Sequence, residues 1–209
     1  FLWQEGHTAH ANAAEAEEET KRMLEAYCDL CENTLAMPVL VGRKPEHEKF
    51  PGAVDTYCVE AMMQDGKALQ AGTSHFLGQN FAKSANISFI NNQGQSEYAY
   101  TTSWGVSTRL IGGVIMTHAD DDGMVVPPKI APYQVVIVPV IKKPEDSEAI
   151  MAYINKLAAA LKTQAPFAEK IRLKIDRRDK ASVDKFWEWT RKGAPVICEI
   201  GMRDVEGNK

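Results

Sequence analysis

The chain opens with an alternation of aromatic and polar residues that predicts a β-strand over residues 1–7. One face of this strand would carry the odd-numbered residues, which are Phe1, Trp3, Glu5 and His7. A face that joins aromatic rings to a carboxylate and an imidazole is not typical of a core. We therefore interpret it as the floor of a binding site, and an exposed edge strand is the alternative.

A helical period follows from about Ala9 to Asn33, with Thr8 as the expected N-cap. The acidic residues in its first half are interpreted as a solvated face. The apolar stripe of this helix contains Met23, Leu24, Tyr27 and Leu30. We expect the helix to serve as scaffold.

Short strands and turns follow the helix. The runs expected to be strands lie at residues 37–41, 54–63, 67–72, 87–90 and 97–105, and the first of them is expected to be short and buried. Asp65-Gly66 predicts a hairpin turn, and residues 72–81 are expected to form a Gly-rich turn. The arrangement predicts an α+β fold, in which a mostly antiparallel sheet carries helices on one side.

The pattern changes after Pro127-Pro128. Strands are expected at residues 134–141, 171–176 and 195–200, and helices from Asp146 or Ser147 to Thr163 and over residues 182–192. Strand, helix, strand, helix, strand in this order predicts a parallel or mostly parallel α/β domain. Its first strand is continuously apolar, which indicates burial on both faces.

The composition is that of a globular protein, with 44% hydrophobic and 25% charged residues among 209. The longest apolar run, residues 135–141, is too short to span a bilayer, and no secretory signal is visible, so a cytoplasmic location is expected. The chain begins without Met in a strand-like segment and stops without a closing element. We therefore expect it to be a piece of a longer protein.

Charge is divided unequally along the chain. Residues 151–209 hold 13 Lys and Arg against 8 Asp and Glu, whereas residues 1–150 hold 11 against 20. A basic second part is the pattern expected of a domain that meets a polyanion, although such an excess is also common on solvated helices.

Basic groups stand beside aromatic residues in this second part. Arg178 belongs to a charged connection, and Lys185 shares a predicted helix with Trp187 and Trp189. Such a combination suits an unstacked RNA loop. The alternative places one of the Trp side chains in the core and leaves the charges solvated.

The stretch most suggestive of ligand chemistry is residues 101–112. Ser103 and Gly105 would let the backbone lie close under a ligand, and Ser107 can cap a helix whose first turn holds Arg109. The guanidinium fork suits a phosphate or the flat face of a base. The alternative is a surface Arg paired with an acid.

Three other motifs have plainer interpretations. Cys28 and Cys31 are spaced as C-x-x-C but lack the second pair that a closed zinc site needs, so helix packing is favoured and no structural metal is expected. Residues 120–122 are three consecutive Asp, which indicate a loop more than a magnesium site. Hydroxyls and His75 after Gly72 indicate a turn packed against a ligand more than a nucleophile site.

Three ordered stretches, residues 1–8, 72–81 and 102–109, resemble prolyl-tRNA synthetase, and the resemblance continues through residues 125–132 to residues 199–204. It implies a class II synthetase antiparallel sheet flanked by helices, followed by a partial α/β anticodon-binding domain. The implied domains are residues 1–130 for the catalytic core and residues 131–209 for the anticodon-binding domain.

The resemblance also implies site residues. Those expected at ATP are Phe1, Gln70, Thr73 and Arg109, with Arg109 as the catalytic residue. Those expected around proline are Trp3, Glu5, His7, Phe50, His75, Ser103, Trp104 and Gly105. Those expected at tRNA are Arg178 and Lys185.

The implied activity is ATP-dependent conversion of proline to prolyl-adenylate, then transfer to the 3′ end of tRNA(Pro). ATP and Mg²⁺ are the implied cofactors, and a homodimer of the full-length protein is expected, with no DNA and no membrane partner. Compared with the family, motif 1 and the first strand of motif 2 are missing, and the second domain stops after its third strand. We therefore expect this chain alone to be inactive. The lack of room for a large editing insertion suggests the archaeal and eukaryotic type.

Two alternatives stay open at this stage. One is a sister class II synthetase for another small amino acid, such as threonine, although the threonine enzymes use a zinc with a Cys ligand and the pocket stretches hold no Cys other than Cys58. The other is a non-catalytic relative that only binds RNA. Such a relative would have lost the pocket, and the presence of Glu5, His7 and Arg109 weighs against it.

Overall fold

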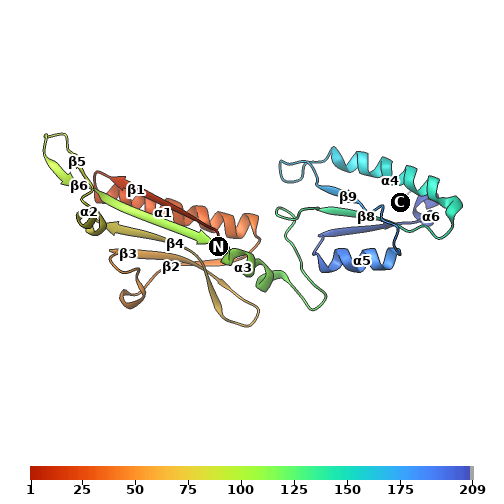
Figure 1. Cartoon of the computed structure of the whole chain (residues 1–209), viewed down its shortest axis with the longest axis horizontal. Coiled ribbons are helices and arrows are strands. Elements are labelled where there is room, and N and C mark those ends of the chain that lie inside the picture. Colours follow the sequence, from red (N-terminus) through yellow and green to blue (C-terminus); the bar gives the residue numbers. More distant parts are fainter. Residues whose placement is uncertain (208–209) are drawn as a thin grey trace. The chain divides into compact units, whose positions relative to one another are not determined.

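The computed structural model describes residues 1–207 and divides into two compact units (Figure 1). The first unit spans Phe1–Thr117, and the second begins at His118. The division therefore falls before Pro127-Pro128. None of the helices within the described residues is long and apolar enough to cross a membrane.

The first unit is built on a five-stranded antiparallel sheet in the order β1-β7-β4-β3-β2. Its strands are β1 (Trp3–His10), β2 (Val39–Arg43), β3 (Asp55–Met62), β4 (Ala68–Gly78) and β7 (Tyr100–Ser107). A separate ribbon pairs β5 (Ser88–Ile90) with β6 (Ser96–Tyr98). The helices are α1 (Ala13–Asp29) with a π-helical turn after it (Leu30–Thr34), a 3-10 turn (Glu46–Glu48), α2 (Asn80–Ala85) and α3 (Arg109–His118).

Helix α1 covers one face of this sheet. The buried core between helix and sheet consists of Leu24, Tyr27, Cys31, Met37, Val59, Ala61, Met63 and Ala71. Leu24 and Tyr27 of the predicted apolar stripe therefore pack on the sheet, as amphipathic periodicity requires. The predicted α+β layout, an antiparallel sheet with helices, is confirmed.

The pairing register decides which side chains share the opposite face. Glu5 pairs with Gly105, and Ser103 pairs with His7 on one side and with His75 on the other. Directly paired residues project from the same face of a sheet. The side chains of Glu5, His7 and His75 therefore gather on the face that α1 leaves uncovered.

The first strand is longer than predicted. It runs to His10, and the hydroxyl of Thr8 is hydrogen-bonded to that of Thr102 at 2.5 Å instead of capping a helix. Asn12 is the N-cap of α1, because its side-chain oxygen accepts the amide hydrogen of Glu15 at 2.9 Å. The prediction of Thr8 as the cap was wrong because pairing with β7 outweighs a local capping preference.

The Gly-rich turn predicted over residues 72–81 is also wrong in its first part, since β4 continues to Gly78. Gly72 is a strand residue that passes under α1, where a Cβ atom would lie 3.1 Å from Cδ2 of Tyr27. The glycine therefore allows close helix packing and does not make a turn. Gly78, with a φ of +57°, ends the strand.

Two other strand predictions need correction. The segment at residues 37–41 was expected to be buried, but β2 is an edge strand with β3 as its one neighbour, and Leu40 is 74% exposed. Residues 97–105 were expected to be one strand. They belong to two, because β6 pairs in the ribbon and β7 in the main sheet.

Gly6 and Trp104 lie in close contact on the face of the sheet that α1 covers. They are paired across β1 and β7, and a Cβ atom on Gly6 would lie 2.2 Å from Cε2 of the indole. The indole also packs against the core beneath α1. It can lie flat over β1 only because residue 6 has no side chain.

The second unit is a three-stranded parallel sheet in the order β10-β8-β9. Its elements are β8 (Val135–Pro139), a 3-10 turn (Pro144–Asp146), α4 (Ser147–Lys162), β9 (Leu173–Ile175), α5 (Ser182–Arg191), β10 (Val196–Ile200) and α6 (Met202–Gly207). The α4 side of β8 buries Ile137, and the α5 side buries Val136 and Val138. Burial of this strand on both faces is as predicted, whereas α6 was not predicted.

Replacing Gly6 by Ala is expected to destabilise the first unit. The added methyl group would overlap the indole of Trp104, and overpacking of this kind costs about 1–3 kcal/mol. Gly42→Ala on β2 is the control, because nothing lies within 4 Å of a Cβ atom there. Calorimetric unfolding of the protein that contains this chain would measure both. Equal stability of Gly6→Ala and wild type would contradict the packing described.

Candidate functional site

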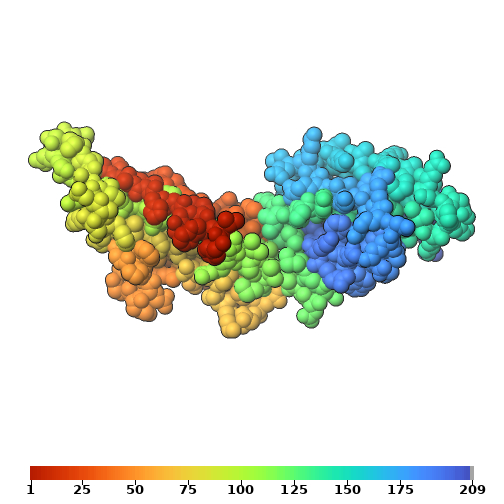
Figure 2. All heavy atoms as spheres, in the orientation of Figure 1, coloured from red at the N-terminus to blue at the C-terminus, as the bar shows by residue number. Residues whose placement is uncertain are grey.

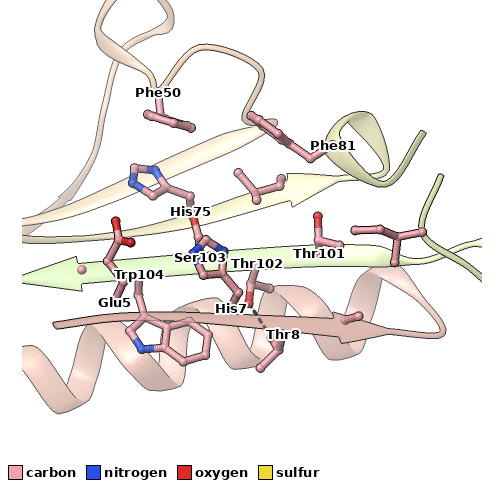
Figure 3. Close-up of a pocket in the computed structure, with 14 residues that line it drawn as sticks. Glu5, His7, Thr8, Phe50, His75, Phe81, Thr101, Thr102, Ser103 and Trp104 are labelled. Carbon is pink, nitrogen blue, oxygen red and sulfur yellow. Dashed lines mark hydrogen bonds between the residues drawn. The ribbon is translucent and has the colours of Figure 1, made fainter. Parts of the chain in front are cut away.

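A cavity of about 530 Å³ lies on the uncovered face of the first sheet (Figure 3). The strands of the sheet form its floor, and the segments before β3 and after β4 form its upper wall. The residues that line it are Glu5, His7, Thr8, Ala9, Phe50, His75, Leu77, Phe81, Ile87, Thr101, Thr102, Ser103, Trp104 and Gly105. Seven of the eight residues predicted around proline are in this set, and Trp3 is the exception.

Three rings make the wall of this cavity. The ring centroids of Phe50 and His75 lie 4.9 Å apart, and those of Phe50 and Phe81 lie 6.1 Å apart with nearly parallel planes. Figure 3 shows all three on the same side of the strands. Phe81 was not predicted as a site residue, because only folding brings α2 over Phe50. The cavity therefore offers apolar ring faces together with the exposed carboxylate of Glu5.

His75 is held in the cavity as a neutral imidazole. Its Nδ1 atom lies 3.0 Å from the hydroxyl of Thr56, which is buried on β3. Burial, and then the nearby ammonium of Lys44, lower the pKa of His75 to about 4. At neutral pH, the cavity thus has an uncharged ring nitrogen opposite the carboxylate of Glu5.

The indole ring of Trp104 lies apart from the three rings of the wall. Its indole points to the α1 side of the sheet, away from Phe50 and His75 (Figure 3), where it packs over Gly6. Trp104 is therefore among the residues of the cavity, but its ring does not stand beside those of Phe50 and His75. Strand alternation is the physical reason, since Ser103 and Gly105 take the cavity side and residue 104 must take the other.

A second, smaller cavity of about 280 Å³ lies next to the first. Its lining residues are Phe1, Trp3, Glu5, Gln70, Ala71, Gly72, Gly105, Val106, Ser107 and Arg109. Phe1, Gln70 and Arg109, three of the four residues predicted at ATP, are brought together here. Trp3, predicted around proline, lines this cavity instead, and its ring meets that of Phe1 edge-on with centroids 6.2 Å apart. Glu5 and Gly105 line both cavities.

Arg109 begins α3, as the sequence indicated. Its amide donates to the hydroxyl of Ser107 at 3.2 Å, and its guanidinium donates to the main-chain oxygen of Gln70 at 3.3 Å. No ion pair of Arg109 with a carboxylate is found within residues 1–207. The amide of Thr108 donates to the carbonyl of Leu2, which holds the red N-terminal segment beside the green α3 on the surface in Figure 2.

A β-bulge aims Gln70 at this second cavity. The register of β3 with β4 shifts between Val59 and Glu60, so that Ala71 is the extra residue. Without the bulge, Gln70 would share the face of Gly72 and point under α1. Its side-chain oxygen instead accepts a hydrogen bond from Lys44 at 2.5 Å. Lys44 was not predicted, and no sequence pattern places the segment after β2 beside residue 70.

Thr73 lines neither of the two cavities, although it was predicted at ATP. It is partly buried on β4, where it pairs with Gly105 on one side and Cys58 on the other. It shares the uncovered face with His75. Its position is thus beside the wall that the two cavities have in common.

Asp176 is the centre of a polar network in the second unit. Its carboxylate, 1% exposed, accepts hydrogen bonds from Nε and Nη2 of Arg178 at 2.9 and 2.6 Å and from the indole of Trp189 at 2.8 Å. These bonds hold the pKa of Asp176 well below its usual range despite burial, with the Arg178 side chain as the largest cause. Glu188 pairs with Arg178 from the other side.

The two residues predicted at tRNA are both engaged in this network. Lys185 is only 5% exposed, and its ammonium donates to the main-chain oxygen of Asp176 at 3.3 Å. Lys185 therefore holds the loop, and little of its side chain is exposed. Arg178 lies on the surface but is pinned by two carboxylates. Trp189 is buried, as one alternative had it, while Trp187 is exposed.

A cavity of about 510 Å³ adjoins this network, at the carboxyl ends of β8 and β9. Its basic lining residues are Arg177, Arg178, Lys180 and Lys185. Strand order reverses at β8, because β9 lies on one side of it and β10 on the other. Ligands of parallel α/β sheets bind in crevices at such points.

The other motifs have structural roles. The side chain of Asp120 accepts the amides of Asp122 and Gly123 at 2.9 and 3.1 Å, which makes residues 120–123 a turn. Cys31 is buried in the core under α1, and burial, with Cys28 as the next cause, raises its pKa to about 11. Within residues 1–207, no group of three or more His, Cys, Asp or Glu side chains is placed to hold a metal ion.

Comparison with known proteins agrees with this geometry. The family described as "Anticodon binding domain" matches residues 134–209. The chain is similar to the proline-tRNA ligases of Paramagnetospirillum magneticum and Erythrobacter litoralis. The sequence identities are 59% and 58%, and each alignment covers 99% of this chain. Over nearly its whole length, the chain is thus similar to part of these proline-tRNA ligases. It spans about two-fifths of the length of these relatives, 41% and 40%.

Two solved structures of prolyl-tRNA synthetase from Cryptosporidium parvum match the fold over 99% of the chain. One, complexed with L-proline and AMP, has a TM-score of 0.89 and 42% identity over 44% of its own length. The other, complexed with halofuginone and AMPPNP, has a TM-score of 0.92 and 44% identity over 41% of its length. Both confirm the class II prolyl-tRNA synthetase fold.

The pKa of His75 predicts a dependence of stability on pH. The unfolded chain binds a proton on this residue below about pH 6.5, whereas the folded chain binds it only near pH 4. Stability should therefore fall as the pH falls through this window. The test compares thermal unfolding of wild type and His75→Gln between pH 7 and pH 4. Wild type should lose more stability than the variant, and parallel losses would contradict a neutral His75.

Replacing Asp176 by Ala is expected to destabilise the second unit. The indole N–H of Trp189 would lose its acceptor inside the core, and an unsatisfied buried donor costs about 1–3 kcal/mol. Asp179→Ala is the matched control, because Asp179 lies on the surface of the same loop. Calorimetric unfolding would measure both variants. Similar small losses for the two would contradict the central place of Asp176.

Proposed function

We propose that the protein containing this chain is a proline-tRNA ligase, which activates proline with ATP and transfers it to the 3′ end of tRNA(Pro). The observation that carries the proposal is the pair of adjoining cavities that share Glu5 and Gly105 as lining residues. One cavity is walled by rings, and the other holds Arg109 next to exposed aromatic side chains. An amino-acid activating enzyme needs two such compartments side by side.

The ring-walled cavity suits proline. Its pyrrolidine ring is apolar, and Phe50, Phe81 and His75 supply apolar faces for it. Its secondary ammonium needs an acid, and Glu5 offers the carboxylate on the floor. The similarity to a Cryptosporidium parvum enzyme complexed with L-proline and AMP supports this assignment.

The smaller cavity suits the nucleotide. The ring of Phe1 is 95% exposed, and the guanidinium of Arg109 has no carboxylate partner within the described residues, so both are free to clamp a purine. Gln70 reaches the same space, and we place Thr73 near the nucleotide on family grounds. The charge of Arg109 would also face the phosphates.

The reaction follows from this placement. The proline carboxylate attacks the α-phosphorus of ATP, a C–O–P linkage forms, and pyrophosphate leaves. The carboxylate is already ionised at neutral pH, so alignment and charge stabilisation do most of the work. Gly105 has no side chain to stand between the two compartments. The terminal ribose hydroxyl of tRNA(Pro) then displaces AMP from the prolyl group.

Mg²⁺ remains an expectation from the family resemblance. The described residues gather no acidic set of three or more for it, so we assign it no step here. We also propose, on family grounds alone, that the full-length protein is a homodimer and acts in the cytoplasm.

The second unit is proposed to bind the anticodon region of tRNA(Pro). The crevice beside the loop of residues 176–180 carries Arg177, Arg178 and Lys180 at its surface, which suits a ribose-phosphate backbone. Arg178 would act with its two carboxylate contacts kept. Lys185 would act only by holding the loop.

Replacing Arg109 by Ala in the full-length protein should lower proline-dependent pyrophosphate exchange by about 10²–10³-fold, because one charged donor at the phosphates is lost. Retention of tRNA(Pro), measured by filter binding, should stay within about 2-fold. Arg22→Ala on the exposed face of α1 is the matched control and should leave both unchanged. Equal loss of exchange and tRNA binding would count against the division of labour between the two units.

A further inference from the structure

Thr56 connects two walls of the larger cavity without lining it. It lies on β3 directly opposite His75, and its side chain is 1% exposed. Its hydroxyl oxygen accepts the amide hydrogen of Phe50 at 3.0 Å and lies 3.0 Å from Nδ1 of His75. One buried hydroxyl thus contacts both the segment that carries the Phe50 ring and the imidazole that this ring packs against.

The hydrogen bonds of Thr56 favour one tautomer of the imidazole. The Phe50 amide can only donate, so the Thr56 oxygen accepts there and its own hydrogen is left to donate. Nδ1 of His75 is the one acceptor found for that hydrogen within residues 1–207. That hydrogen is satisfied only when Nδ1 is unprotonated, and in a neutral ring the proton then resides on Nε2. Burial and Lys44, which keep the ring neutral, are consistent with this assignment.

The tautomer decides what the cavity presents to a ligand. With Nε2 protonated, His75 offers a hydrogen-bond donor to a carboxylate or carbonyl oxygen. Because the ring carries no charge, it does not repel the ammonium that Glu5 attracts. With the other tautomer, Nε2 would be an acceptor and Nδ1–H would compete with the hydroxyl hydrogen of Thr56.

We propose that Thr56 is a positioning residue for proline recognition, which fixes His75 as the Nε2–H tautomer and anchors the Phe50 wall at one distance from it. This inference rests on the proposed function. Thr56 itself touches neither substrate. It acts through His75 and Phe50, so its loss should affect the proline compartment and leave the nucleotide compartment unchanged.

The experiment uses the full-length protein and proline-dependent pyrophosphate exchange. Thr56→Val keeps the shape of the side chain but can neither accept from Phe50 nor donate to His75. Its KM for proline should rise about 10-fold, with the KM for ATP unchanged. Thr56→Ser keeps the hydroxyl and should return the KM for proline to within about 2-fold of wild type.

Thr20→Val is the matched control. Thr20 is also fully buried, but its hydroxyl donates to the main-chain oxygen of Ala16 within α1, on the other side of the sheet. This variant should lose stability without any rise in the KM for proline. An equal rise in Thr20→Val would overturn the inference, because it would show a general response to lost core hydrogen bonds.

A second pair of variants tests the path through His75. In a His75→Ala background, Thr56→Val should raise the KM for proline by less than it does in wild type, since one of its two contacts is gone. If Thr56→Val does not fold, Thr56→Cys takes its place. Its KM for proline should rise by less than the roughly 10-fold expected of Thr56→Val.

The outcomes separate the inference from the proposed function. Absence of proline-dependent exchange in the wild-type protein removes the basis of both. Normal exchange with an unchanged KM for proline in Thr56→Val, or no rescue by Thr56→Ser, overturns the inference and leaves the proposed function standing.

Discussion

The packing of α1 on one face of the antiparallel sheet is the constraint on which the first unit depends. Strand residues alternate between faces, so whatever does not go under α1 goes to the opposite side. Leu24 and Tyr27 of the helix bury the apolar half of the alternation. The polar half, with Glu5, His7 and His75, is thereby collected on one surface. The candidate site is a consequence of covering a single face.

Deviations from alternation are as important as the rule. The bulge at Ala71 turns Gln70 out to the smaller cavity, where an uninterrupted strand would have buried it. Gly6 is a second local feature, because alternation directs residue 104 to the α1 side and the missing side chain at Gly6 leaves room there for the indole. Both are local features with a direct effect on which atoms a ligand would meet.

Several charged and titratable groups in this chain are buried or hydrogen-bonded within the protein and thereby stabilise its structure. Asp176 is buried as an anion because Arg178 and Trp189 donate to it, and Lys185 is buried against a main-chain oxygen of the same residue. His75 is kept neutral by burial. A basic or acidic residue near a crevice is therefore not by itself a free contact for a ligand, since its hydrogen bonds within the protein come first.

The sequence by itself determined the elements whose patterns are strong and local: the long amphipathic helix, the Asp65-Gly66 hairpin, the buried strand β8 and the cap at Ser107. It also placed candidate residues on β1 and β7, where alternation fixes a face once a strand is known, whereas Thr73 and His75 were expected in a turn and lie on β4. Tertiary structure alone decided which aromatic rings meet in the cavity. Phe81 reaches Phe50 through the packing of α2, and the indole of Trp104, which alternation directs to the α1 side, finds room there over Gly6. These contacts join residues far apart in the chain, and no period in the sequence encodes such a distance.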